Sequence, residues 1–376
     1  MLSRIMKPKI LTIVSRMNLG GIAVVVTETI NGTSDKYEHL LVTGRCAKNE
    51  IEYLNNHKLD SNVIYLQNLQ RKIGLFSELF AIIEIIRIIK KYKPNIIHTH
   101  ASKAGFSGRI AALISNSNAK RIHTFHGHIL FGYFPKVISN ILIFIERFLA
   151  RNTHTLIAVS QTSKNELLTL KIGKPNQWQV IPLGVNGNLN SLAKKTFELQ
   201  NQINLVWVGR FEEVKNPILA IDAVNEFSKL NPKIKIKFRM VGDGNLLTEC
   251  KSYAAKSNLE IVFTGWLEIP FELSDDLLLM TSKNEGFGLV ILEAGLRGIP
   301  TVSTAIPVAK EIIDNGISGF ISEANPKAIA EKISEIVASP SHYLEVTQNI
   351  SRIVVNKFGL QKMLNDYYKL FDTFLN

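Results

Sequence analysis

The sequence predicts an α/β protein built from two doubly wound domains, each with a mostly parallel sheet. The chain has 376 residues, which is too long for one small core and suits two domains of ordinary size. Short apolar runs alternate with helical patterns along both halves, and this alternation is typical of parallel sheets with helical crossovers. The alternation is interrupted by a polar stretch near 187–202 that lacks apolar periodicity and is therefore the expected linker.

In the N-terminal half, apolar runs bounded by turn residues predict strands. These are expected at Lys9–Ser15, His39–Thr43, Asn62–Leu66, Asn95–His98 and Arg121–Thr124. Isoleucines at helical spacing predict a helix over Glu78–Lys93 that ends before Pro94, and a further helix is expected from about Gly105 to Ile114. The pair Gly20-Gly21 follows the first strand, at the start of another helical segment.

The C-terminal half repeats this alternation. Strands are expected at Asn204–Val208, Lys233–Val241, Glu260–Thr264, Leu277–Thr281, Pro300–Thr304 and Gly319–Ile321, with a helix at Pro217–Leu230. In Lys233–Val241 basic and apolar residues alternate, which predicts one face in solvent, as at a sheet edge.

The domain prediction places an N-terminal Rossmann-like domain at 1–187, the linker at 188–202 and a C-terminal Rossmann-like domain at 203–358. Residues 359–376 are expected to form a helix that returns to the N-terminal domain. Ligands of such sheets collect at the carboxyl ends of the strands, so we expect the site in a central cleft that the two domains face.

The net charge of +12 belongs to the N-terminal half. Residues 1–187 hold 24 Lys/Arg and 10 Asp/Glu, a net +14, whereas the remaining residues sum to −2. Such a surface could attract nucleic acid, anionic lipid or a phosphorylated substrate, and charge alone does not choose among them. The two cysteines fit a reducing compartment. No secretion signal is expected, because the apolar stretch Ile10–Val14 near the N-terminus is too short. No membrane-spanning stretch is expected either, because Glu146 and Arg147 interrupt the most apolar run, Val137–Ala150.

One motif, Ser282–Gly295, follows an apolar strand and leads into a helix. Gly286 and Gly288 form a tight loop whose amides, with the helix N-terminus, can face a phosphate. Glu285 precedes the loop and Glu293 follows it; a carboxylate can accept hydrogen bonds from vicinal hydroxyls of a sugar or ribose. The alternative is a surface pair of glutamates beside an ordinary strand-to-helix turn.

A second motif, Gly209–Asn216, also follows a strand. Gly209 lets the backbone turn closely, and Arg210 and Lys215 can converge on a diphosphate. The alternative is two solvated bases in a loop.

Five histidines, His98, His100, His123, His126 and His128, cluster in the N-terminal half and raise the possibility of a metal site. No acidic or cysteine cluster accompanies them. We therefore predict no metal, and expect His98 and His123 to be core histidines with satisfied hydrogen bonds.

Together the two motifs resemble the signatures of glycosyltransferase family 4, a set of retaining enzymes with the GT-B fold. These signatures are a Gly-Arg…Lys-Asn loop and a Glu-x7-Glu segment, and they match Gly209–Asn216 and Glu285–Ala294 in the family's order. The resemblance runs from about Lys9 to the C-terminus. One departure is the segment Ala305–Lys310, where the family often has a Gly-Gly pair.

The resemblance implies roles for individual residues. Arg210 and Lys215 would hold the donor diphosphate, Glu285 would contact hydroxyls of the donor sugar, and Glu293 would bind the ribose. Donor contacts from the loops would come from Gly209, Gly286, Phe287, Gly288 and Leu289. On the N-terminal domain, Gly20 and Gly21 would line the cleft, and His126 would lie near the donor sugar, with His128 as its weaker alternative.

The sequence segments around His98 and His123 resemble those of a bacterial subgroup of this family, which builds surface polysaccharides on polyprenyl-diphosphate carriers. The implied function is a hexosyltransferase that moves a sugar from a nucleotide-diphosphate donor, expected to be a UDP-sugar, to a lipid-linked saccharide during O-antigen, capsule or exopolysaccharide assembly. The resemblance implies no cofactor besides the donor substrate, no nucleic acid and no obligate protein partner.

The implied location is cytoplasmic, peripheral at the inner face of an anionic membrane. Phe131–Lys136 and the apolar Ile138–Phe148 would serve that contact, unless they form an ordinary loop and a buried helix. Two other functions stay open: a GT-B sugar-nucleotide epimerase, and a basic nucleic-acid- or membrane-binding protein without catalysis.

Overall fold

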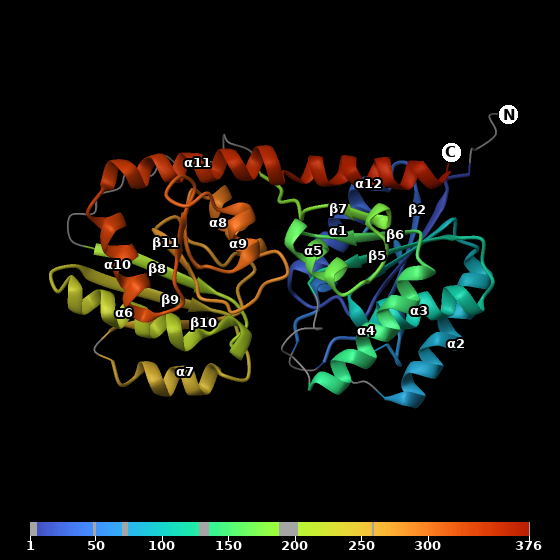
Figure 1. Ribbon diagram of the computed structural model, residues 1–376, viewed down its shortest axis with the longest axis horizontal. Coiled ribbons are helices and arrows are strands. Elements are labelled where there is room, and N and C mark those ends of the chain that lie inside the picture. Colours follow the sequence, from blue (N-terminus) through green and yellow to red (C-terminus); the bar gives the residue numbers. More distant parts are fainter. Residues whose placement is uncertain are drawn as a thin grey trace. The chain divides into compact units, whose positions relative to one another are not determined.

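The computed structural model describes residues 6–47, 50–69, 74–127, 135–187, 202–257 and 259–375, and the chain divides into two compact units (Figure 1). Unit 1 comprises Met1–Gly184 together with Leu360–Asn376, and unit 2 comprises Val185–Gly359. Each unit holds one parallel sheet with helices on both sides, which confirms the predicted fold class of two Rossmann-like domains.

Unit 1 is built on a seven-stranded parallel sheet in the order β3-β2-β1-β4-β5-β6-β7. Its strands are β1 (Lys9–Val14), β2 (Glu38–Gly44), β3 (Asn62–Leu66), β4 (Ile96–His100), β5 (Lys120–Phe125), β6 (Thr155–Ala158) and β7 (Trp178–Val180). The central strands are buried on both faces, so they read as apolar runs. The strand order reverses between β1 and β4, which makes their carboxyl ends the natural ligand position in this unit.

Six α-helices are described in unit 1. They are α1 (Gly21–Thr33), α2 (Leu75–Tyr92), α3 (Ser102–Ile114), α4 (Lys136–Arg151), α5 (Gln161–Thr169) and α12 (Leu360–Leu375). The terminal helix α12 packs on α1 and on the chain after it: Tyr37 lies edge-on against Phe371 at 5.5 Å, and its hydroxyl donates a hydrogen bond to Asp372 at 2.6 Å. The last helix of the chain is therefore part of the N-terminal unit.

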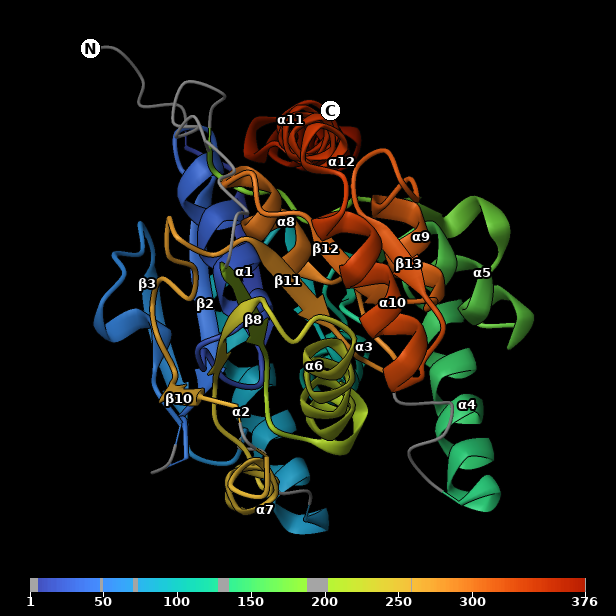
Figure 2. The same cartoon turned by 90° about the vertical axis from the view of Figure 1, so that its left-hand side faces the viewer.

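Unit 2 is built on a six-stranded parallel sheet in the order β10-β9-β8-β11-β12-β13. Its strands are β8 (Gln202–Val208), β9 (Lys235–Val241), β10 (Ile261–Gly265), β11 (Leu277–Met280), β12 (Thr301–Thr304) and β13 (Phe320–Ser322). Its α-helices are α6 (Pro217–Leu230), α7 (Leu247–Ala254), α8 (Leu289–Leu296), α9 (Pro307–Ile312), α10 (Pro326–Val337) and α11 (Pro340–Phe358). Figure 2 shows α6 and α10 side by side, as their contacts require.

The prediction that the strand with alternating lysines lies at a sheet edge is wrong. β9 pairs with β8 on one side and β10 on the other, and β10 forms the edge. The charged face of β9 is explained differently: Lys235 and Lys237 reach solvent, while Arg239 is covered and donates to Asp275 at 2.6 Å. An open sheet face therefore produced the pattern that we attributed to an edge.

The chain changes units between Gly184 and Val185 and again between Gly359 and Leu360. Val185 already belongs to unit 2, because its amide donates to the Phe358 carbonyl at 2.9 Å. The expected linker at 188–202 lies outside the described residues except for Gln202, which begins β8.

Candidate active site

The strands of unit 2 end in loops held against one another at the carboxyl edge of the sheet. Gly209 follows β8, and its amide donates to the Val241 carbonyl at 3.0 Å. Gly242 follows β9 with a φ of +134°, and a Cβ there would lie 1.9 Å from the Gly209 carbonyl oxygen. Only glycine fits this approach, so Gly242 fixes the position of the Gly209 loop.

The two sequence motifs meet at this edge. Lys215 lies on the turn after β8, and its Nζ is 2.5 Å from Oε1 of Glu285, which follows β11. The Ser282 hydroxyl donates to the same oxygen at 2.7 Å. Both charged side chains are largely buried. The Lys283 amide also donates to the Val214 carbonyl at 2.8 Å, so backbone as well as side chains joins the two loops.

Arg210 lies apart from this pair. Its side chain is half exposed, and Nη1 is 3.2 Å from Oε1 of Glu212. Among the described contacts Arg210 reaches neither Lys215 nor Glu285. Its convergence with Lys215 on a diphosphate therefore stays a prediction.

The helix α8 begins within the second motif. Its N-cap Gly288 has a φ of +82°, and neither a side-chain cap nor an acidic residue occupies its first turn. The first amides of a helix lack partners inside the helix and carry partial positive charge, which favours an anion. Phe287 is buried against Phe358, at 5.7 Å between ring centroids, and holds the loop in place. Gly286 and Leu289 flank these residues and are partly buried.

Glu293 is the fifth residue of α8, one turn into the helix. Burial raises the pKa of its carboxyl to about 7, and the nearby Arg297 guanidinium offsets part of this shift. In the part of the chain that the structure describes, this carboxyl accepts no hydrogen bond. Such a group can still accept one from a ligand hydroxyl.

In unit 1, two histidines meet at the carboxyl ends of β4 and β5. His100 Nδ1 lies 2.9 Å from His126 Nε2, and the two rings stack at 5.2 Å. Burial lowers the pKa of His126 to about 4 and that of His100 well below its ordinary value, so both are neutral near pH 7. One ring must then donate to the other. Nδ1 of His126 is buried without a partner within the described ranges.

His98 and His123 are buried in β4 and β5, as expected of core histidines. His98 Nε2 bonds the Thr124 hydroxyl at 2.8 Å, and His123 Nδ1 bonds the Thr99 hydroxyl at 2.9 Å. The prediction that both ring nitrogens of a core histidine are hydrogen-bonded is wrong for His123, because its Nε2 is buried with no partner among the described residues. No group of three or more His, Cys, Asp or Glu suited to a metal ion occurs in the described ranges, and His128 lies outside them.

Gly20 and Gly21 begin α1 after β1. Gly20 is the N-cap with a φ of +152°, and Gly21 is the first helical residue. The first turn of α1 has no acidic side chain and no side-chain cap. The pair thus lies at the same edge of the unit 1 sheet as His100 and His126.

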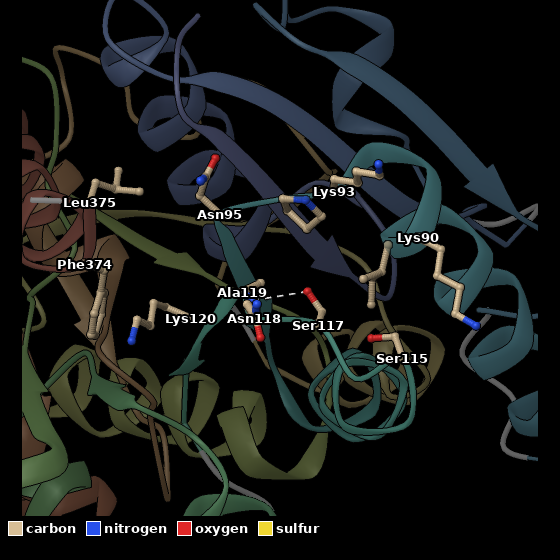
Figure 3. A pocket seen from close by; sticks show the side chains of 12 residues that line it. Lys90, Lys93, Asn95, Ser115, Ser117, Asn118, Ala119, Lys120, Phe374 and Leu375 are labelled. Atoms are coloured by element: carbon tan, nitrogen blue, oxygen red, sulfur yellow. Dashed lines mark hydrogen bonds between the residues drawn. The ribbon is translucent and has the colours of Figure 1, made fainter.

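A shallow pocket of about 430 Å³ lies at the opposite, amino edge of unit 1 (Figure 3). Asn95 and Lys120 line it at the beginnings of β4 and β5, with Lys90 and Lys93 from the end of α2. Figure 3 shows the three lysine side chains pointing in different directions. The pocket contains none of the residues singled out above, so we do not assign the reaction to it.

The comparisons with known proteins match both halves of the chain. Residues 19–188 match the family model Glycosyltransferase Family 4, and residues 190–352 match the model Glycosyl transferases group 1. The two models follow one another along the chain, one for each parallel-sheet unit. The chain is a glycosyltransferase with the GT-B fold.

Two relatives of this glycosyltransferase are themselves named as glycosyltransferases. A UDP-Gal:alpha-D-GlcNAc-diphosphoundecaprenol alpha-1,3-galactosyltransferase of Escherichia coli is 28% identical over 360 residues, which cover 87% of this chain and 92% of the relative. The capsular polysaccharide biosynthesis glycosyltransferase CapM of Staphylococcus aureus is 27% identical over 84% of this chain and 86% of its own. The structure of Anabaena HepE with UDP and glucose superposes with a TM-score of 0.78 at 21% identity, covering 97% of this chain and all of that one.

Two residues of the candidate site, Ser282 and His100, could have been recognised from the sequence. Ser282 precedes Glu285 by three residues in the loop, a spacing that allows the hydroxyl to reach the carboxylate. His100 was noted without a role, although His100 pairs in register with Thr124, two residues before His126. Adjacent parallel strands place such residues close together at one edge.

Proposed function

We propose that this glycosyltransferase transfers a sugar from a UDP-sugar to a polyprenyl-diphosphate-linked saccharide, with retention of anomeric configuration, in the assembly of a bacterial surface polysaccharide. The proposal assigns the donor to unit 2 and the acceptor to unit 1. The donor half rests on Lys215, Glu285, Glu293 and the start of α8. The acceptor half rests on the basic charge of residues 1–187 and on the names of the relatives.

The observation that carries the donor half is the Lys215–Glu285 pair at the carboxyl edge of unit 2. The carboxylate orients the ammonium, and a donor diphosphate beside Lys215 and the α8 amides would be neutralised from two sides. Glu285 keeps a second carboxylate oxygen that can accept from a sugar hydroxyl. Arg210 is proposed to swing from Glu212 to the same diphosphate.

The proposed chemistry is a front-face transfer. The acceptor oxygen forms its bond to the anomeric carbon on the side from which the diphosphate leaves, while the bond between that carbon and the diphosphate oxygen breaks. The acceptor proton passes to the leaving diphosphate. Lys215, Arg210 and the loop amides stabilise the negative charge that develops there. His126 is the histidine that we propose to act in the transfer, and its Nδ1 has no partner within the described ranges.

The acceptor half is supported by the Escherichia coli relative, whose name specifies a sugar on a diphosphoundecaprenol carrier. A lipid-linked diphosphate is anionic and lies at a membrane, and the net charge of +14 on residues 1–187 suits both properties. None of the described helices is both long and apolar enough to cross a membrane.

The direct test is a transfer assay with a panel of UDP-sugars and polyprenyl-diphosphate-linked monosaccharides, with the product anomer assigned by NMR. We expect one donor to be consumed only with acceptor and the product to keep the donor's configuration. Inversion would contradict the retaining mode. Conversion of a UDP-sugar without acceptor would show an epimerase instead.

We propose that the cationic side chains and backbone amides stabilise the leaving diphosphate without a divalent metal ion. We expect the transfer rate to stay within about twofold when EDTA is added, because Lys215, Arg210 and backbone amides act on the diphosphate. The same assay after addition of magnesium or manganese is the control. Loss of transfer in EDTA and recovery with metal would contradict this part.

Glu293 predicts a pH-dependent affinity for UDP. Because its pKa is about 7 in the free protein, the carboxyl is largely protonated below that pH and ionised above it. Ribose hydroxyls donate to the ionised form, so binding lowers the pKa of this group. Affinity should therefore rise as the pH increases from about 6 to 8, with proton release on binding.

Calorimetry in two buffers of different ionisation enthalpy measures this proton release. Glu293→Gln is the control, since the amide does not titrate. It should weaken UDP binding by about tenfold or more at pH 8, because a hydrogen bond to a charged group is lost. The β-phosphate of UDP titrates in both proteins, so equal pH profiles would refute the role of Glu293.

A further inference from the structure

A buried hydroxyl lies against the turn that carries Lys215. It belongs to Thr281, which directly follows β11 in unit 2 and is 1% exposed. The turn is the one-turn 3-10 helix Glu213–Lys215 after β8, and β8 and β11 are neighbours in the sheet (Figure 2). Thr281 therefore reaches the turn from the adjacent strand, at the edge where Lys215 pairs with Glu285.

The Thr281 hydroxyl is hydrogen-bonded on both sides. Its oxygen accepts from Nε1 of Trp207, a β8 residue that is 2% exposed, at 3.1 Å. The same hydroxyl donates toward two successive carbonyl oxygens, at 3.1 Å to that of Lys215 and at 2.9 Å to that of Asn216. Because an indole N–H can only donate, the single hydroxyl proton is directed at the turn, where the two carbonyls share it.

The turn depends on contacts from outside. It is three residues long, which is too short for a helix to be stable by itself. Asn216, which follows it, has a φ of +50°, in the left-handed region that is costly for residues other than glycine. Pro217 then begins α6 without an amide to donate. Such a conformation persists only where neighbouring groups determine it, and the Thr281 hydroxyl is one of these groups.

Trp207 holds the hydroxyl in one orientation because its own ring is fixed in the core of unit 2. The ring packs on Phe211, at 4.9 Å between ring centroids. It also lies beside the Gly209 loop, since a Cβ on Gly209 would be 3.3 Å from Cη2 of Trp207 and 3.8 Å from Cδ of Lys215. The ring and the aliphatic part of the lysine side chain thus pass close to the same glycine.

The residue after Thr281 holds the other member of the ion pair. The Ser282 hydroxyl donates to Oε1 of Glu285 at 2.7 Å, and the Ser282 carbonyl accepts from the Thr304 hydroxyl of β12 at 2.6 Å. Two adjacent residues at the end of β11 therefore hold the two partners. Thr281 holds the backbone of Lys215, and Ser282 holds the carboxylate of Glu285.

We propose that Thr281 is a positioning residue for sugar transfer, which sets the direction of the Lys215 side chain through the two carbonyls that it bonds. The inference rests on the proposed function, in which the Lys215 ammonium acts on the leaving diphosphate. A displacement of about 1 Å would weaken that action strongly, because catalytic groups must be held in one geometry before the reaction. Since Thr281 is buried, it acts through Lys215 and not on the substrate.

The first measurement does not depend on transfer. Thr281→Val removes the hydroxyl and keeps a β-branched side chain of similar size. Hydrogen–deuterium exchange of the Lys215 and Asn216 amides, which bond within the turn, should become about tenfold faster. Thr281→Ser should exchange like the native chain. The matched control is Thr301→Val, the same change at a fully buried hydroxyl that has no partner among the described residues. Unchanged exchange in Thr281→Val would overturn the proposal.

Steady-state kinetics then connect the turn to the reaction. Thr281→Val should lower kcat/KM by about tenfold, while Thr281→Ser and Thr301→Val should keep the native value. In a Lys215→Ala background the same valine should cause less than about twofold further loss, because the hydroxyl acts only through that ammonium. A further tenfold loss there would overturn the proposal, since a general defect of folding is independent of Lys215.

Trp207→Phe keeps the test open if the valine variant does not fold. It removes the donor to the hydroxyl and leaves Thr281 in place, so kcat/KM should fall by about threefold. Native kcat/KM in both variants, with transfer by the native chain, would overturn this inference alone. A native chain that transfers no sugar would refute the proposed function and the role of Thr281 in the reaction, and the exchange rates would still decide whether Thr281 holds the turn.

Discussion

Lys215→Ala should lower kcat/KM by about 30- to 1,000-fold, the equivalent of about 2–4 kcal/mol of transition-state stabilisation. The structure holds Lys215 in place through Glu285 and through the loops joined around it. Charge develops on the departing diphosphate, and a preoriented ammonium stabilises it more than it stabilises the bound donor. Steady-state transfer kinetics with a saturating acceptor measure the loss.

The matched control lies in the same two loops. Lys283 pairs with Glu213 at 2.9 Å, but both side chains are exposed. Lys283→Ala should therefore change kcat/KM by less than about threefold, since exposed ion pairs contribute little. Comparable losses in the two variants would mean that joining the loops, and not the charge of Lys215, supports activity. A thermal melt of each variant excludes unfolding as the cause.

Glu285→Ala tests the same pair from its other side. We propose that Glu285 contacts the donor sugar in addition to its pairing with Lys215. Its removal should therefore raise KM for the donor and lower kcat. If the double variant Lys215→Ala with Glu285→Ala loses no more activity than either single variant, the two residues act as one unit.

The largest expected effect on stability comes from Arg109→Ala, at about 3–5 kcal/mol. The Arg109 side chain is 2% exposed and joins α3 to α4 through both oxygens of Glu146. Removal of the guanidinium leaves a buried carboxylate without its partner. Denaturant-induced unfolding, followed by fluorescence, should show a lower midpoint for the transition of unit 1.

The double replacement Arg109→Met with Glu146→Leu should recover most of this loss, because two apolar side chains of similar size need no partner. Lys9→Ala is the control, since its ion pair with Glu38 spans 3.9 Å at the surface. It should cost less than about 1 kcal/mol. A double replacement as unstable as Arg109→Ala would point to lost packing instead of an unpaired charge.

The fold could be predicted from the sequence because parallel strands buried on both faces appear as continuous apolar runs. The ends of the strands predicted in this way lie within two residues of those in the structure. The strand β9 was misplaced because an open sheet face and a sheet edge give the same alternation of lysines. One sequence period cannot distinguish these two environments, since each exposes one side of the strand.

The site was only partly predictable for a similar reason. The resemblance implied that Lys215 and Glu285 both contact the donor, but their pairing depends on β8 and β11 being neighbours in the sheet. Glu146 looked like an interruption of an apolar stretch, and its burial against Arg109 requires knowledge of which helix packs beside it. The pairing of His100 with His126 likewise depends on strand register.

The terminal helix α12 has a consequence for how the protein is made. Unit 1 is formed by Met1–Gly184 and Leu360–Asn376, and the whole of unit 2 lies between these two segments in the sequence. A Cβ at Gly32 of α1 would lie 2.5 Å from Cδ1 of Leu364, so the Leu364 side chain packs directly on the backbone of α1. During synthesis this surface of α1 therefore stays uncovered until α12 has left the ribosome.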